Sequence, residues 1–375
     1  MKHTTLLAAG FAVSATSAFA GGIDRSGQSI TALFEDGNYL EFSYGIVTPN
    51  VSGTQLQTVS ASSYVGAESG NMSESYALPG AAYKRDLNDK LSFALIWDQP
   101  FGADVAYPTA TSIPAYAYSG STASIKSNGL TAVGRYKFSD RISVHAGLRS
   151  VTSEGQVALS NGYTMSTSKE TDFGYLVGAS YEIPDIALRA AITYNSAIDH
   201  DFTTTENATG IPADFTNPMV TTLPQSVTLA FHTGIAADTL LMASVRWAEW
   251  TTFDISPVAY TASEGDALVD YDNDVFTYSL GVGRRFNDTL SGSVTIGYEK
   301  SNGGYAGNLG PTDGNISLAL GLKYQVNDNT AISGGVRYIK IGDATTEAPN
   351  PLTGDFANFN DNHAMAVGLK LSHTF

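Results

Sequence analysis

Apolar residues alternate with small or polar residues along the last segment of the chain, His363 to Phe375. One face of this segment carries Met365, Val367, Leu369, Leu371 and Phe375, and the other carries Ala364, Ala366, Gly368, Lys370, Ser372 and Thr374. A period of two residues is typical of a β-strand that lies between two environments. The segment therefore predicts the closing strand of an outer-membrane β-barrel.

The same period recurs along the chain in segments that are separated by turn residues. About fourteen such strands are expected, an even number as in single-chain bacterial barrels. Their approximate bounds are 39–48, 74–85, 91–101, 125–138, 141–153, 171–183, 186–196, 223–235, 239–255, 276–283, 293–298, 316–324, 330–341 and 363–375. Short polar turns alternate with long loops, as the periplasmic and extracellular ends of a barrel do. Because every strand is needed to close the sheet, we expect residues 39–375 to form one all-β antiparallel transmembrane barrel.

The first twenty residues have the pattern of a signal peptide. A short basic region at Lys2 and His3 precedes an apolar stretch from Thr4 to Val13, and Ala18-Phe19-Ala20 forms a small-x-small cleavage site. The apolar stretch is shorter than the roughly 20 residues that a membrane-spanning helix needs. We therefore expect residues 1–20 to be removed, Gly21 to begin the mature chain, and the protein to reach the outer membrane of a Gram-negative bacterium.

Composition agrees with a barrel and excludes one class of partner. Hydrophobic residues make up 43% of the chain and charged residues 15%, yet no apolar run after the signal is long enough for a transmembrane helix. A net charge of -16 argues against nucleic acid, since phosphate binding needs basic patches. We expect outer-membrane lipid and lipopolysaccharide as partners, the latter met through divalent cations or local basic residues.

Aromatic residues lie near the ends of the expected strands, where they predict girdles at the two membrane interfaces. The alternative is ordinary β-propensity, because aromatic residues favour strands anywhere. The residues concerned are Tyr136, Phe138, Tyr181, Tyr194, Trp247, Trp250, Tyr324, Tyr338 and Phe375.

Several segments together resemble a known family. The best match is LPQSVTLAFHTGIAADTLLMASVRWAEWTTFDI, residues 223–255, which looks like the family's Leu-Pro strand, short turn and following strand that ends in Trp-Ser/Thr-x-Phe. Support comes from IDRSGQSITALFEDGNY, from PNVSGT and from the hairpin FTYSLGVGRRFNDTLSGSVTIGYEKS. On these residues the chain resembles the FadL/TodX family (OMPP1) of outer-membrane transporters for long-chain fatty acids and other hydrophobic compounds.

The resemblance implies a fourteen-stranded barrel with an amino-terminal plug, the hatch, expected here at residues 21–38 and beginning Gly21, Gly22, Ile23, Asp24. It also implies capture of a hydrophobic small molecule by extracellular loops, here 154–170 and 197–222, binding in the lumen, and sideways exit at a kinked third strand. The terminal Phe375 is expected to be read by the barrel assembly machinery. The chain lacks the Asn-Pro-Ala usual at the end of the hatch.

The segment from Trp97 to Gly102 has the composition of a kink in the third strand. Proline cannot donate to a sheet ladder and glycine weakens a strand, so both favour bulges or breaks. The expected lateral opening is lined by Asp98, Gln99, Pro100, Phe101 and Gly102. The alternative is that the strand ends there and that Pro100 belongs to the following loop.

Basic residues fall on the faces that point into the expected lumen. The candidates for contact with a substrate carboxylate are Arg135, Arg149, Arg189, Arg246 and Arg337. The same side chains are suited to hold the hatch through Asp24, Glu35 and Asp36, or simply to balance charge in a water-filled lumen. A general or anion-tuned porin for small polar solutes is therefore the alternative to a hydrophobic transporter.

No pattern in the chain predicts catalysis, a metal site or a cofactor. The acidic loop around Asp270, Asp272 and Asp274 lacks the glycine and glutamate spacing of an EF-hand, so a solvated loop is expected. A lipase that uses Ser226 and His232 is the enzyme reading that the sequence leaves open. We expect passive, substrate-selective transport of hydrophobic molecules, long-chain fatty acids foremost, without covalent chemistry.

Overall fold

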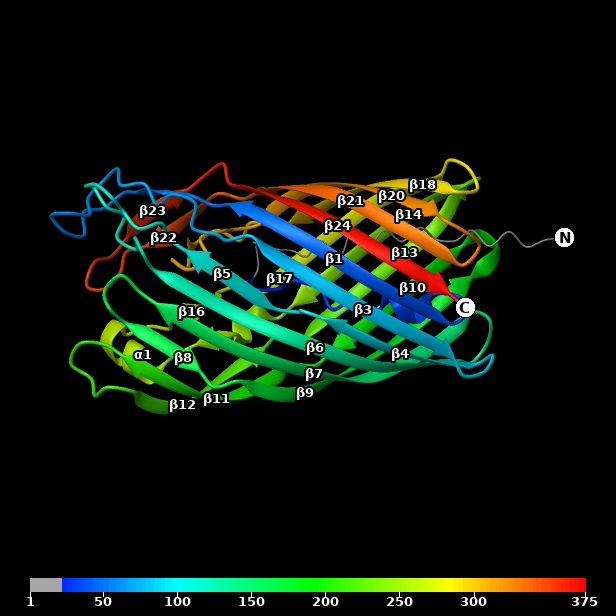
Figure 1. The fold of residues 1–375 in the computed structure, drawn as a ribbon, viewed down its shortest axis with the longest axis horizontal. Coiled ribbons are helices and arrows are strands. Elements are labelled where there is room, and N and C mark those ends of the chain that lie inside the picture. Colours follow the sequence, from blue (N-terminus) through cyan, green and yellow to red (C-terminus); the bar gives the residue numbers. More distant parts are fainter. Residues whose placement is uncertain (1–21) are drawn as a thin grey trace.

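Fourteen long strands form a closed antiparallel ring in the computed structural model, which describes residues 22–375 (Figure 1). In order around the ring they are β1 (Tyr39–Asn50), β3 (Tyr76–Asp86), β4 (Leu91–Asp98), β6 (Thr122–Lys137), β7 (Ile142–Ala158), β9 (Glu170–Ile183), β10 (Leu188–Asn195), β13 (Ser226–Ala236), β14 (Thr239–Ala248), β17 (Val275–Arg285), β18 (Leu290–Glu299), β20 (Asn315–Gln325), β21 (Thr330–Ile341) and β24 (His363–Thr374). The ring closes where β24 pairs with β1, from Tyr39 opposite Thr374 to Asn50 opposite His363. The expected fold class and strand number are confirmed; the signal peptide and Gly21 lie outside the described residues.

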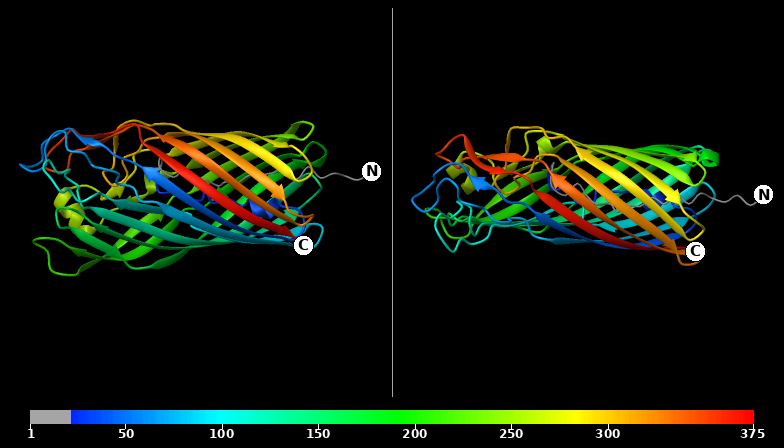
Figure 2. Two further views of the ribbon diagram at one scale, coloured as in Figure 1. Left: turned by 45° about the horizontal axis from the view of Figure 1, so that its top comes forward. Right: turned by 90° about the horizontal axis from the view of Figure 1, so that it is seen from above.

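Short turns lie at one end of the barrel, where the carboxyl terminus also lies, and long loops lie at the other (Figure 2). The turns form locally because an asparagine side chain accepts a backbone N–H three residues later. Asn88, Asn287 and Asn327 accept from Leu91, Leu290 and Thr330 at 3.0, 2.9 and 2.9 Å. A short 3-10 turn, η2 (Pro184–Ile186), connects β9 to β10.

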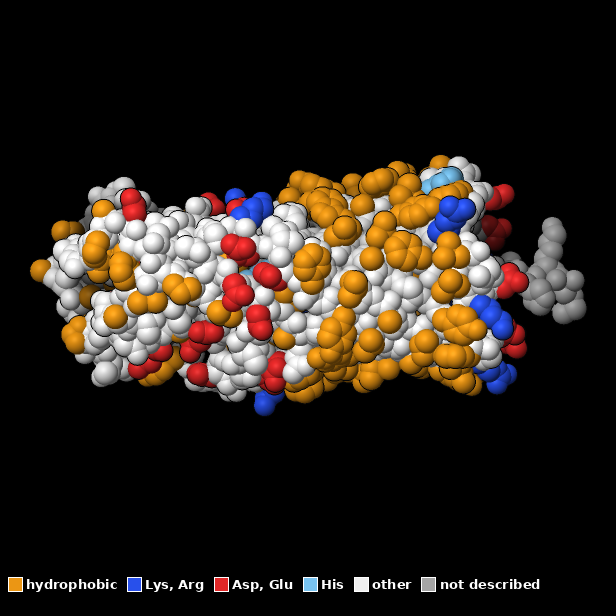
Figure 3. All heavy atoms as spheres, turned by 90° about the horizontal axis from the view of Figure 1, so that it is seen from below, with side chains coloured by type: hydrophobic (Ala, Val, Ile, Leu, Met, Phe, Trp, Pro, Cys, Tyr) orange, Lys and Arg blue, Asp and Glu red, His pale blue; other side chains and the backbone are white. Residues whose placement is uncertain are grey.

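The outer surface of the barrel carries an apolar band. On β17, for example, Phe276, Leu280 and Val282 are exposed, while Gly281 and Gly283 on the other face are buried. Figure 3 shows apolar side chains gathered over the half of the barrel nearest the turns, bordered on the loop side by acidic side chains. A band of this kind is what lipid around a barrel requires. Among the described residues, the helices are all too short or too polar to cross a membrane.

Most residues of the expected aromatic girdles lie on the outside, but Trp250 does not. Tyr136, Phe138, Tyr181, Tyr324, Tyr338 and Phe375 are exposed. The expected strand 239–255 ends at Ala248, and the chain turns inward through η3 (Trp250–Thr252). Trp250 is thereby only 1% exposed and packs edge-on against Phe101, with ring centroids 6.1 Å apart. The inward turn buries a large apolar ring inside the barrel, which the period-two pattern does not reveal.

The wall continues beyond the membrane band on the loop side. β5 (Gly102–Ala106), β8 (Thr164–Thr167), β11 (Ile198–Asn207) and β12 (Phe215–Leu223) extend the sheet. The expected capture loops 154–170 and 197–222 are therefore mostly strand hairpins. The loops are further joined by a small sheet of β2 (Thr54–Gln55), β19 (Tyr305–Ala306), β22 (Ala344–Glu347) and β23 (Asp355–Phe359), by the pair β15 (Asp254–Ile255) and β16 (Val269–Asp270), and by α1 (Val258–Glu264).

Residues 22–38, called the N-terminal segment below, lie against the inward face of the barrel. A 3-10 turn, η1 (Thr31–Phe34), places Leu33 in a fully buried cluster with Ala94, Val133 and Leu176. Ile23 packs in a second cluster that includes Phe101 and Trp250. The segment is too short to have a core of its own, so the barrel wall supplies its apolar contacts.

Candidate functional site

The third strand of the barrel is interrupted where the sequence predicted a kink. β4 ends at Asp98 and β5 begins at Gly102, and both pair with β6. Residues 99–101 thus oppose only Ser127 and Asn128, which is a bulge. The ladder is held at this point by Ser127, whose hydroxyl accepts the Phe101 N–H at 2.9 Å and donates to the Phe101 carbonyl at 2.5 Å.

On its other side the interrupted strand leaves a gap against β3. β3 pairs with β4 only from Ala81 to Asp86, and its residues 77–80 have no ladder partner in β4 or β5 among the described pairings. Hydrogen bonds resume beyond the gap, where Glu74 N–H donates to the Asp104 carbonyl at 3.1 Å and Ala106 N–H to the Met72 carbonyl at 2.8 Å. The wall is therefore intact above and below a stretch of β3 that pairs with β1 but not with β4 or β5.

The N-terminal segment takes the hydrogen bonds that β3 does not make. Arg25 N–H donates to the Pro100 carbonyl, and Gly102 N–H donates to the Ile23 carbonyl, both at 2.8 Å. Pro100 itself has no N–H to offer. Because buried backbone groups need partners, the kinked strand depends on the N-terminal segment. The residues expected to line a lateral opening therefore lie beside the gap: Asp98, Gln99, Pro100, Phe101 and Gly102.

One side chain bridges the gap. The Arg25 guanidinium pairs with Asp104 at 2.5 Å and lies over the Tyr76 ring, 3.9 Å from its centroid. A Cβ at Gly102 would lie 2.6 Å from the Arg25 Cζ, so this guanidinium position requires glycine there. The role of Arg25 was not predicted, although it is the one basic residue in the sequence 21–38.

Further polar contacts tie the N-terminal segment to three strands. Asp24 pairs with Arg246 at 2.8 Å, and the Ser26 hydroxyl donates to Asp98. The Gln28 side-chain oxygen accepts from the Ser226 hydroxyl at 3.3 Å. Because Asp98, Ser226 and Arg246 lie on β4, β13 and β14, the segment is fixed from both sides of the lumen.

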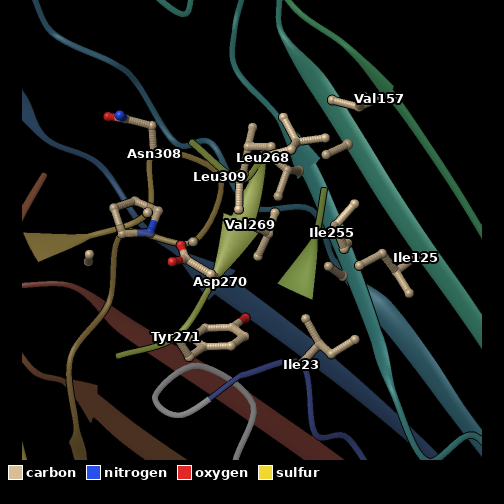
Figure 4. Close-up of a pocket in the computed structure, with 18 of the residues that line it drawn as sticks. Ile23, Ile125, Val157, Ile255, Leu268, Val269, Asp270, Tyr271, Asn308 and Leu309 are labelled. Carbon is tan, nitrogen blue, oxygen red and sulfur yellow. The ribbon is translucent and has the colours of Figure 1, made fainter. Parts of the chain in front are cut away.

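A cavity of about 1050 Å³ lies between the N-terminal segment and the loops. Figure 4 shows Ile23, Ile125, Ile255, Leu268 and Val269 around this space, with Asp270 and Asn308 as polar neighbours. A cavity of this size and lining suits a small hydrophobic molecule. Arg25, Tyr76, Gly102 and Asp104 line it as well, so the cavity reaches the gap.

The five arginines predicted to face the lumen are buried or half-buried on barrel strands, but none is among the described residues that line this cavity. Arg135 pairs with Glu182, and both Arg135 and Arg189 lie over the Phe34 ring at 4.8 and 4.6 Å. Arg149 donates to the Asn195 side-chain oxygen at 3.3 Å. Arg246 holds Asp24, and Arg337 is half-buried on β21. Three of the five therefore contact the N-terminal segment.

Ser226 and His232 do not come together. They lie six residues apart on β13, roughly 20 Å along a strand. His200 instead forms a hydrogen bond at each ring nitrogen. Its Nδ1 lies 2.7 Å from Asp172 on β9 and its Nε2 lies 3.1 Å from Ser153 on β7, so the side chain connects β11 to both strands. Within residues 22–375 no group of three or more acidic, histidine or cysteine side chains is arranged to hold a metal ion.

The comparisons with known proteins agree with this architecture. Solved structures with the same fold include a FadL homologue of Pseudomonas aeruginosa (TM-score 0.73, 15% identity, 92% of this chain and 91% of that one). The toluene transporters TodX of P. putida (0.61, 13%, 91% and 91%) and TbuX of Ralstonia pickettii (0.62, 12%, 96% and 97%) are also similar. At such identities the likeness concerns the fold.

None of the curated proteins matches the chain. The model of one protein family, described as outer membrane protein transport protein (OMPP1/FadL/TodX), matches residues 3–375. With nearly the whole sequence matched and a fourteen-stranded barrel formed, the chain belongs to the OMPP1/FadL/TodX family of outer-membrane transport proteins.

Proposed function

We propose that the protein carries hydrophobic compounds passively through the outer membrane and releases them sideways into the bilayer. The compound enters the cavity between the loops, binds above the N-terminal segment, and leaves between β3 and the interrupted third strand. The observation that supports this route most is the stretch of β3, residues 77–80, that has no ladder partner in β4 or β5 and lies beside a cavity that extends to Gly102.

The physical gain of a sideways exit comes from the apolar part of the compound. Passage into lipid is worth about 0.8 kcal/mol for each methylene removed from water, whereas release into the periplasm returns the chain to water. Long-chain fatty acids and monoaromatic hydrocarbons both have the apolar surface that such an exit requires. A sideways exit is therefore equally compatible with long-chain fatty acids and with monoaromatic hydrocarbons as substrates.

Arg25 is the barrier on this route. Its guanidinium spans the gap between Tyr76 and Asp104, so a compound leaves only when this side chain moves aside. The N-terminal segment that carries Arg25 also provides the hydrogen bonds of the kink. A displacement of the segment and the opening of the gap are therefore one event in this proposal.

Photolabelling tests the route without altering the protein. A dodecanol analogue that carries a diazirine is irradiated with the purified protein in lipid vesicles, and the labelled residues are mapped by mass spectrometry. We expect labels within residues 76–80 and 98–103 that disappear with excess dodecanol, while labels on the lipid-facing band persist. Competed labels confined to the turn end of the lumen would instead support an exit into the periplasm and overturn the proposal.

A further inference from the structure

The cavity is lined by far more acidic than basic side chains. The acidic residues of its lining are Asp24, Glu74, Asp104, Glu154, Glu264, Asp266, Asp270, Asp272, Asp313 and Glu347. Among the described lining residues, the only side chains able to carry a positive charge are Arg25 and His200. A ligand in this space therefore lies in a negative potential, strengthened by the apolar walls that keep water away.

Both basic side chains are already engaged. The Arg25 guanidinium is paired with Asp104 and covered by the Tyr76 ring. His200 is 1% exposed and uses one ring nitrogen on Asp172 and the other on Ser153. A carboxylate in the cavity thus finds no open cationic partner among the described lining residues, and it would also face the surrounding carboxylates.

Asp270 is the acidic group best placed to meet a ligand. It lies on β16, exposed to the cavity, and Figure 4 shows it beside the apolar side chains of Leu268 and Val269. Burial raises the pKa of Asp270, and the nearby Asp266 and Asp272 carboxylates raise it further. This mutual repulsion would be relieved by a positive charge placed among the three groups.

Another polar group at the cavity has no hydrogen-bond partner among the described residues. Thr221, on β12 directly opposite His200, lines the cavity and is 4% exposed. Its hydroxyl oxygen makes no hydrogen bond with the described residues. Since an unpaired buried hydroxyl is costly, it is suited to accept a hydrogen bond from a ligand N–H or O–H.

We infer that the cavity selects hydrophobic compounds with a positively charged end, such as alkyl or aryl amines, admits uncharged ones and excludes carboxylates. This inference rests on the proposed transport of hydrophobic compounds. The apolar walls hold the apolar part, while Asp266, Asp270 and Asp272 hold the ammonium group.

Three probes of one chain length test this selectivity: dodecylammonium, dodecanol and dodecanoate. Uptake of each labelled compound is measured at pH 7 in Gram-negative cells that lack their own transporter, after subtraction of uptake by cells with the empty vector. We expect dodecylammonium to enter at least tenfold faster than dodecanoate, with dodecanol between them.

Three variants assign the effect to the cavity. Replacing Asp266, Asp270 and Asp272 together by asparagine should abolish the preference for dodecylammonium and leave dodecanol uptake intact. The matched control removes the same charge at the turn end through Asp140→Asn, Asp288→Asn and Asp328→Asn, and it should keep the preference. Asp104→Asn frees the Arg25 guanidinium, so it should raise dodecanoate uptake.

The outcomes separate the two proposals. Uptake of dodecanoate at the rate of dodecylammonium, or a preference that survives the loop triple variant, would overturn the charge selectivity while leaving hydrophobic transport in place. Uptake of none of the three probes above the empty vector would overturn hydrophobic transport itself.

Discussion

At the scale of single residues, glycines and one arginine set the contact between the N-terminal segment and the wall. Gly102 leaves room for the Arg25 guanidinium, and Gly22 leaves room for Trp250. A Cβ at Gly22 would lie 2.3 Å from the Trp250 ring, and its φ of +82° is one that other residues rarely adopt. The fit of the segment thus depends on the absence of two side chains.

Gly22→Ala should therefore loosen the N-terminal segment, whereas Gly27→Ala should not do so to the same extent. Gly27 also has a positive φ, +60°, but nothing lies within 4 Å of a Cβ there. Both variants therefore strain the backbone, and only Gly22→Ala also brings a Cβ into contact with the Trp250 ring. Single-channel conductance and protease sensitivity of the segment measure the effect. Equal behaviour of the two variants would show that contact with Trp250 does not hold the segment.

Arg25→Met tests the bridging side chain, because it keeps an apolar stem and removes the charge that binds Asp104. If the bridge adds about 1.4 kcal/mol to the exit barrier, uptake of dodecanol rises about tenfold. Lys90→Met, at an exposed position in the turn between β3 and β4, is the control and should leave uptake unchanged. A fall in uptake with the barrel folded would mean that Arg25 assists the passage.

At the scale of elements, the N-terminal segment and the interrupted strand behave as one unit. The segment donates to Pro100, accepts from Gly102 and is held by Arg246 and Ser226. On the turn side, η1 places Phe34 between Arg135 and Arg189. These contacts hold the segment against the inner wall, as a plug requires, so we predict a plugged transporter rather than an open porin.

Deleting residues 22–34 should accordingly open the barrel. We expect a steady ohmic conductance in planar bilayers that the full chain does not show, because the ring of fourteen strands keeps all of its ladder pairs. Heat-modifiable migration on gels checks that the variant is folded. A folded deletion variant with unchanged conductance would rule out the plug.

The closing strand carries the prediction on assembly. Phe375 is exposed, its ring stacks on Tyr83 at 6.3 Å, and its N–H donates to the Asn38 carbonyl at 2.9 Å. Phe375→Ser should lower the amount of inserted barrel if the assembly machinery reads the ring. Phe286→Ser, another exposed phenylalanine at a turn, is the control. Normal yield of Phe375→Ser would exclude this role.

At the scale of the whole molecule, the sequence predicted the barrel and the kink but not the contacts that make the site. Strands such as β17 and β20 were readable because lipid demands an apolar residue at every second position. In β11 the buried face mixes Ile198 and Phe202 with His200, Thr204 and Glu206, so the apolar alternation is weak and the pattern predicts a loop there. The pairs Arg25–Asp104 and Asp24–Arg246 join residues far apart in sequence, and no local pattern marks them.

The central claim is that compounds leave through the gap beside β3. A reversible disulfide bond across the edge of this gap tests the claim most directly. Ser73 and Val105 form an isolated antiparallel bridge at the loop side of the gap, which is the spacing that a disulfide needs. The natural chain has no cysteine, so Ser73→Cys with Val105→Cys introduces one defined bond. Val294→Cys with Leu320→Cys, a paired position between β18 and β20, is the control.

The measurement is dodecanol uptake by each double variant, oxidised and then reduced. We predict that oxidation of the Ser73/Val105 pair suppresses uptake and that a reductant restores it, while the control pair transports equally in both states. Undiminished uptake by a fully oxidised Ser73/Val105 barrel would contradict the lateral exit.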